Sequence, residues 1–277
     1  MKVRGASSES IDDRIAIEEP LEIRVNGEVV AITMRTPGED ARLALGFLFS
    51  EGIVGSIDDV GTIAPCGRPG DDGYGNAIEV TPSPGVHFEL EKVAASRRGT
   101  LTTAACGVCG RRSVDDLLAL TGTVGDSRPL PIATVPGAFA QLSTIQQNFR
   151  ETGGVHAAAA ISHDGNLIHG FEDVGRHNAV DKVIGALIQD RRVSSPMLRG
   201  ARRPSDTDVA LLVVSGRASF EIIQKAAMAR IPVVASVSAA SSLAIELADR
   251  ANVALVGFVR EGAMNVYTHR ERLSGLS

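Results

Sequence analysis

Asp208-Val209-Ala210-Leu211-Leu212-Val213-Val214-Ser215 is the stretch of this chain that decides its fold. Every residue between its two polar ends is apolar, which is typical of a strand that is buried on both faces of a parallel sheet. Helices and strands then alternate. We expect helices at 220–230 and 242–250, and strands at 233–237 and 253–259. This order predicts an α/β fold with a largely parallel, helix-covered sheet.

Further elements are expected upstream of this unit. Asn26-Gly27 between apolar runs predicts a β-hairpin, and His163-Asp164-Gly165 predicts a second one. The expected hairpin strands are 21–25 with 29–34, and 157–162 with 166–171; other expected strands are 76–81 and 86–90; expected helices are 41–50, 113–120, 137–149 and 178–190. The proline-rich stretch 126–131 is typical of a linker. It divides the chain into a smaller β-rich region, 1–128, and an α/β domain, 129–277.

Composition limits the function classes. The 277 residues are 44% hydrophobic and 22% charged, with a net charge of −5. A negative net charge disfavours nucleic-acid binding, and no run approaches the ~20 apolar residues of a membrane span. No apolar signal sequence opens the chain, so we expect a cytoplasmic protein without a membrane or nucleic-acid partner. The arginine-rich stretch 191–203 is interpreted as a solvated loop.

Sulfur chemistry is expected at Cys106-Gly107-Val108-Cys109, which holds two of the three cysteines. Nearby Arg97, Arg98, Arg111 and Arg112 favour the thiolate form. Four interpretations stay open: part of a structural zinc site, a dithiol redox pair, a sulfur-carrying nucleophile, or two inert side chains. A catalytic zinc site with His156, as in base deaminases, lacks the expected glutamate, because Ala158 stands two residues after the histidine.

Ligand-binding residues are expected where the strands of the α/β unit end. Ser215-Gly216-Arg217, 236–242 and 258–262 follow the three strands, and together they suit a phosphate-bearing ligand. A second cluster, Asp173, Arg176 and His177, precedes a helix and is interpreted as pocket-lining. The alternative for the second cluster is a helix start capped by Asn178, with Asp181 and Lys182 facing solvent. His156 alone is interpreted as a structural histidine.

Five stretches together resemble the formate dehydrogenase accessory sulfurtransferase family, FdhD. They occur in the family's order along most of the chain: Cys106-Gly107-Val108-Cys109-Gly110, 153–158, 172–182, Ser215-Gly216-Arg217 and 257–267.

The resemblance implies a function that the residues alone do not. Such proteins take sulfur from a cysteine desulfurase and deliver it to the molybdenum cofactor for formate dehydrogenase. The implied persulfide carrier is Cys106, with Cys109 as a possible assisting thiol and no metal. The implied segment for the bis(guanine dinucleotide) form of the cofactor is Phe258, Val259, Arg260, Glu261, Gly262 and Ala263. The family also implies a cytidine-deaminase-like domain and a homodimer. A zinc-dependent deaminase-like hydrolase and a cofactor-binding chaperone are the alternatives.

Overall fold

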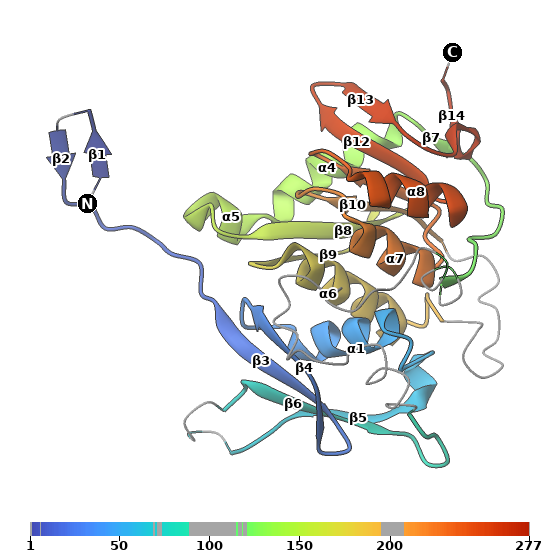
Figure 1. Ribbon diagram of the computed structural model, residues 1–277. Coiled ribbons are helices and arrows are strands. Elements are labelled where there is room, and N and C mark those ends of the chain that lie inside the picture. Colours follow the sequence, from blue (N-terminus) through green and yellow to red (C-terminus); the bar gives the residue numbers. More distant parts are fainter. Residues whose placement is uncertain are drawn as a thin grey trace.

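The structure is a computed structural model that describes residues 2–5, 7–68, 70, 74–88, 115, 118, 121–194 and 208–276. Its largest sheet has six strands in the order β13-β12-β11-β10-β8-β9 (Figure 1). Their bounds are β8 His156–Ser162, β9 Leu167–Asp173, β10 Val209–Val214, β11 Val233–Ser236, β12 Ala254–Arg260 and β13 Ala263–Val266.

The predicted α/β class and the three parallel strands β10, β11 and β12 are confirmed. The outer strands differ from a largely parallel sheet, because β8, β9 and β13 run antiparallel to their neighbours. The β8–β9 and β12–β13 pairs are hairpins, in which a short turn returns the chain in the opposite direction. Strand β10 returns by a longer connection and pairs with β8 on the side away from β9, again antiparallel. Strand β13 was absent from the predicted elements.

Helices cover both faces of this sheet (Figure 1). On one face lie α6 (Arg176–Gln189), α7 (Phe220–Met228) and α8 (Ser242–Arg250), and on the other lies α4 (Thr134–Ile145). Alternate strand residues enter the two cores: Leu212 packs on the α6–α8 side, whereas Leu211 and Val213 pack on the α4 side. The prediction of a single helix at 137–149 was wrong, because the helix is interrupted at Gln146 and a second helix, α5 (Gln147–Thr152), follows.

A second sheet lies below α6 in Figure 1 and has the order β4-β3-β6-β5. Its bounds are β3 Glu19–Val25, β4 Glu28–Arg35, β5 Val60–Pro65 and β6 Ala77–Pro82, with α1 Asp40–Ser50 between it and α6. The predicted Asn26-Gly27 hairpin is confirmed. A strand at 86–90 was wrong for residues 86–88, which form no strand, and residues 89 and 90 lie outside the description.

Helices α1 and α6 cross where each helix has a glycine facing the backbone of the other. A Cβ on Gly46 would lie 1.9 Å from the Asp181 carbonyl oxygen, and one on Gly185 would lie 2.0 Å from the Arg42 carbonyl oxygen. No side chain fits at such distances, so glycine permits the close approach of the two backbones. One hydrophobic core runs from the second sheet to the first. The division at residues 128 and 129 stays a prediction.

Short elements complete the described chain. They are β1 Lys2–Arg4 paired with β2 Ser7–Glu9, β7 Leu130–Pro131 paired with β14 Leu273–Ser274, and the 3-10 helices η1 Ile57–Asp59 and η2 Arg270–Arg272. The expected linker at 126–131 is therefore partly a strand. Residues 115, 118 and 121 are helical, in line with a helix at 113–120. Within the described residues, no helix is both long and apolar enough to cross a bilayer.

Candidate functional site

The three parallel strands end at one edge of the six-stranded sheet, here called the strand-end edge. The Ser236 hydroxyl donates to the Gly216 carbonyl oxygen (3.0 Å), and the Phe258 N–H donates to the Ser238 carbonyl oxygen (3.1 Å). These bonds join the segments that follow β10, β11 and β12. The sequence-predicted strand ends therefore lie side by side, as the geometry of parallel strands requires.

The start of β8 lies at the same edge. The Ser215 hydroxyl accepts a hydrogen bond from the Ala157 N–H (2.8 Å), and His156 pairs with Asp173 at the end of β9. Because α6 follows β9 directly, Arg176 and His177 also arrive here. The two clusters expected separately, at 173–177 and at 215–217, thus form one region. Arg217 is exposed.

Asp173 is fully buried and stabilises the loop that enters α6. Its carboxylate forms an ion pair with Lys182 (2.7 Å) and accepts hydrogen bonds from the Gly175 N–H, the Asn178 side-chain amide and the Thr36 N–H. Lys182 also donates to the Thr36 carbonyl oxygen. Asp181 and Lys182 are both buried, so the alternative in which they face solvent was wrong.

Arg176, His156 and Gly216 lie together beside this loop. A Cβ on Gly216 would lie 3.3 Å from His156 Nδ1 and 3.4 Å from Arg176 Cδ. Burial is the main cause that lowers the pKa of His156 below its ordinary value of 6.5, and the charges of Arg176 and His177 lower it further, while Asp173 opposes them.

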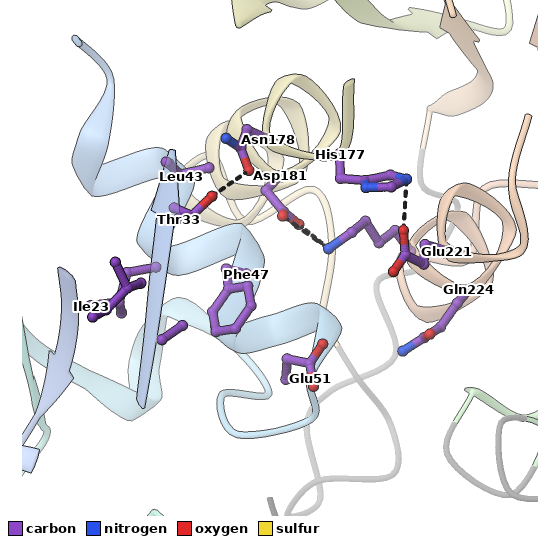
Figure 2. Close-up of a pocket in the computed structure, with 13 residues that line it drawn as sticks. Ile23, Thr33, Leu43, Phe47, Glu51, His177, Asn178, Asp181, Glu221 and Gln224 are labelled. Carbon is purple, nitrogen blue, oxygen red and sulfur yellow. Dashed lines mark hydrogen bonds and ion pairs between the residues drawn. The ribbon is translucent and has the colours of Figure 1, made fainter. Parts of the chain in front are cut away.

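A pocket lies on the other side of His177, between the β3–β4 hairpin, α1, α6 and α7 (Figure 2). The His177 ring Nε2 lies 2.7 Å from Glu221 Oε2 and 3.0 Å from the Ser219 hydroxyl. The wall formed by α6 and α7 is polar, and the opposite wall, formed by the hairpin and α1, is mostly apolar. The lining residues are Ile23, Ala31, Ile32, Thr33, Leu43, Phe47, Glu51, His177, Asn178, Asp181, Glu221, Gln224 and Lys225.

Two ion pairs form the polar wall of this pocket. His177 and Asp181 are one turn apart on α6, and they face Glu221 and Lys225, one turn apart on α7. The Lys225 ammonium lies 2.7 and 2.9 Å from the two Asp181 oxygens. Burial raises the pKa of Asp181, and the charge of Lys225 opposes that effect. Sequence reasoning missed Glu221, Gln224 and Lys225, although charged residues spaced i and i+4 on an otherwise apolar helix were a signal.

The segment expected to bind the cofactor forms the tip of the β12–β13 hairpin. Arg260 pairs with Ala263 across a turn made by Glu261 (φ 50°) and Gly262 (φ 81°), while Val259 is buried. Phe258 has φ 53° and an exposed fraction of 44%. A positive φ is uncommon for an aromatic residue, and such strained residues gather at functional sites.

Cys106 and Cys109 lie outside the described residues. Cys66, the third cysteine, is partly exposed where β5 ends, and its N–H donates to the Ala77 carbonyl oxygen. It does not line the pocket. Within the described part of the chain, no three His, Cys, Asp or Glu side chains are grouped so that they could hold a metal ion.

Comparison with known proteins decides the family. Residues 16–274 match the FdhD/NarQ family. The chain belongs to this family. A sulfur carrier protein FdhD from Anaeromyxobacter dehalogenans is 52% identical over 264 residues, covering 95% of this chain and 90% of that protein. One from Mycolicibacterium paratuberculosis is 44% identical over 266 residues, covering 94% and 92%.

A crystal structure assigned to a formate dehydrogenase accessory protein from Desulfotalea psychrophila has a similar fold. The TM-score is 0.73 at 24% identity, covering 98% of this chain and 96% of that one. The resemblance inferred from five sequence stretches is therefore confirmed, and the chain is a member of the FdhD sulfur-carrier family. The roles of individual residues stay predictions.

Proposed function

We propose that this protein is a sulfurtransferase that accepts sulfur from a cysteine desulfurase on Cys106 and delivers it to the molybdenum cofactor of a formate dehydrogenase. The observation that carries the proposal is 52% identity, over 95% of the chain, to a sulfur carrier protein. Both cysteines of the Cys-Gly-Val-Cys stretch fall inside the residues that match the family. The only described cysteine, Cys66, lies on a different sheet from the strand-end edge.

The loading step is a thiol exchange. The Cys106 thiolate attacks the terminal sulfur of the desulfurase persulfide, a new S–S bond forms on Cys106, and the desulfurase cysteine leaves as a thiolate. One S–S bond replaces another, so the step has no net oxidation or reduction.

Release assigns a role to the second thiol. When the Cys109 thiolate attacks the Cys106 sulfur, the terminal sulfur leaves as sulfide and the two cysteines become a disulfide. A dithiol reductant then restores both thiols. The two electrons that convert the terminal sulfur to sulfide therefore come from the cysteine pair.

The strand-end edge is the proposed binding place of the cargo, the bis(guanine dinucleotide) form of the cofactor. The exposed side chains of Arg217 and Arg260 offer positive charge to phosphate groups, and the exposed Phe258 ring offers an aromatic surface to a base. Gly257 lets the Tyr267 ring pack directly against the backbone beside this segment, because a Cβ there would lie 2.9 Å from that ring. These residues fit a ligand that carries both anions and flat rings.

Desulfurase labelling tests the proposal. The purified protein is incubated with a cysteine desulfurase and cysteine, and its intact mass is read without reductant. We expect wild type and the matched control Cys66→Ala to gain the mass of one sulfur atom, Cys106→Ala to gain none, and Cys109→Ala to load but release its sulfur slowly.

Three outcomes would contradict the proposal. Undiminished labelling of a Cys106→Ala and Cys109→Ala double variant would place the sulfur elsewhere. Full restoration of formate dehydrogenase activity by a cysteine-free variant would favour a chaperone that binds the cofactor without carrying sulfur. Stoichiometric zinc that is lost together with a deaminase activity on changing His156 would favour the hydrolase.

A further inference from the structure

A short segment of the second sheet, residues 33–36, contacts the loop that enters α6, residues 173–178. The segment covers the end of β4 and the residue after it. The Asn178 side-chain nitrogen donates to the Met34 carbonyl oxygen (2.7 Å), and the Thr33 hydroxyl donates to the Asn178 side-chain oxygen (3.1 Å; Figure 2). The β-rich part of the chain therefore bonds directly to a loop that ends at the strand-end edge.

Thr36 uses all three of its polar groups in this contact. Its N–H donates to the Asp173 carboxylate (3.2 Å), its hydroxyl accepts from the Val174 N–H (3.1 Å), and its carbonyl oxygen accepts from Lys182 Nζ (3.0 Å). Asp173 and Lys182 are themselves joined by a buried ion pair (2.7 Å). Thr36 thus closes a ring of polar contacts, and a fully satisfied network of this kind makes the groups in it rigid.

The loop packs closely around these contacts at Gly175. A Cβ on Gly175 would lie 2.8 Å from the Asn178 side-chain nitrogen and 3.4 Å from the Asp173 carboxylate. The Gly175 N–H also donates to that carboxylate (2.8 Å). The next two residues are Arg176 and His177, which begin α6. A change in the contacts of the loop is therefore expected to move both of these side chains.

The Thr36 hydroxyl acts on the loop more than on the rest of the fold. Thr36 follows the last residue of β4 and is only partly buried. In the described part of the chain, its hydroxyl is bonded to the Val174 N–H. Valine has nearly the shape of threonine without the hydroxyl. Its introduction at this position removes that one bond while the backbone contacts of the ring can stay.

We propose that Thr36 is a positioning residue for the cargo site. It is supplied by the β-rich part of the chain, and it acts by fixing the loop that presents Arg176 and His177 at the strand-end edge. The use of this edge to hold the cargo rests on the proposed function. The positioning itself requires only that the two side chains move when the hydroxyl is removed.

Nuclear magnetic resonance of the histidine-labelled full chain tests the positioning without a ligand. His156 and His177 report the strand-end edge, whereas His163 and His269 bond to groups elsewhere in the fold and serve as controls. We expect Thr36→Val to shift the ring signals of the first two alone, and Thr36→Ser, which keeps the hydroxyl, to restore them. A residue that served only stability would lower the urea midpoint and leave these signals of the folded protein unchanged.

Titration with guanosine monophosphate, the nucleotide unit of the proposed cargo, tests the consequence for binding. Thr36→Val should weaken binding by about two- to tenfold, because a hydrogen bond contributes such a factor and a less populated binding conformation lowers the apparent affinity. Thr36→Ser should bind like wild type. Thr62→Val is the matched control, because its hydroxyl bonds to Thr81 within the second sheet (2.6 Å), and it should leave the affinity unchanged.

Unshifted His156 and His177 signals in folded Thr36→Val protein would overturn the positioning role. Equal weakening by Thr36→Val and Thr62→Val, or a Thr36→Ser protein that behaves like Thr36→Val, would also overturn it. If Thr36→Val does not fold, Thr33→Val, which removes another bond of the same segment, decides in its place. A wild-type protein that neither binds the nucleotide nor loads sulfur would contradict the proposed function, and the histidine signals would still decide the positioning.

Discussion

The pocket and the strand-end edge share His177 as a neighbour, but they satisfy their charged groups differently. In the pocket, Asp181 meets Lys225 and His177 meets Glu221, so the helices neutralise each other's charges. At the edge, Arg176 Nε has no partner, and Arg217 and Arg260 are exposed. A pocket lined by ionisable groups is therefore not by itself evidence of a functional site. The pocket wall is complete without a ligand, whereas the edge is not.

The largest expected effect comes from breaking the pocket's buried pair. Asp181→Leu or Lys225→Met alone should lower the free energy of unfolding by about 3–5 kcal/mol, because each leaves one charge buried and unpaired. The double variant should recover most of that loss, since the two side chains bond mainly to each other and, apart from that, only the Ser50 hydroxyl donates to Asp181 among the described residues. Urea denaturation of the four proteins measures the cycle.

The buried pair Asp173–Lys182 is the matched control at the edge. Asp173 also accepts hydrogen bonds from the Thr36 and Gly175 N–H groups, and Lys182 donates to the Thr36 carbonyl oxygen. An apolar replacement of both residues would leave those groups unsatisfied, so we expect no recovery in the double variant. Equal recovery at both pairs would remove the distinction between the two regions.

Parts of this comparison could be predicted from the sequence. The apolar runs of β10, β11 and β12 predict parallel neighbours, and their carboxyl ends then meet at one edge by geometry. The arrival of Arg176 at the same edge could not be predicted, because it depends on the pairing of β8 with β10, which lies far along the chain. A hairpin turn and the alternation of buried residues set the register within β8–β9, but they do not determine which distant strand pairs with β8.

The pocket could not be predicted for a related reason. Its walls come from the β3–β4 hairpin and from α6 and α7, which are far apart in the chain and are held together by the Gly46 and Gly185 crossing. The missed strand β13 did carry a local signal. Glu261-Gly262 provides the positive φ values that a two-residue hairpin turn requires.

Substitutions of Phe258 can test the stability of the strand-end edge and its proposed binding of the cargo separately. Its backbone adopts φ 53°, which suits Gly and Asn and is unfavourable for a β-branched residue. We expect the free energy of unfolding of Phe258→Gly and Phe258→Asn to be no more than about 0.5 kcal/mol below that of wild type. That of Phe258→Val should be about 1–2 kcal/mol lower than wild type. Urea denaturation ranks the three variants.

The same variants report on the cargo. Loss of the exposed ring should reduce activation of formate dehydrogenase in every Phe258 variant, including those that are fully stable. A Phe258→Gly protein that was strongly destabilised would show instead that the ring packs as part of the fold.

His156 gives the smallest expected effect, a pH dependence of stability. Its pKa in the folded protein is lowered from 6.5, so the unfolded chain binds more protons in the window just below 6.5. The sign follows from linkage: His156 contributes stability above pH 6.5 that is lost as the pH falls toward its folded pKa. Urea midpoints of wild type should therefore drop more than those of His156→Gln as the pH is lowered through this window. His163→Gln, at the far end of β8, should follow wild type. A His156→Gln protein with the same pH dependence as wild type would show that another group carries the effect.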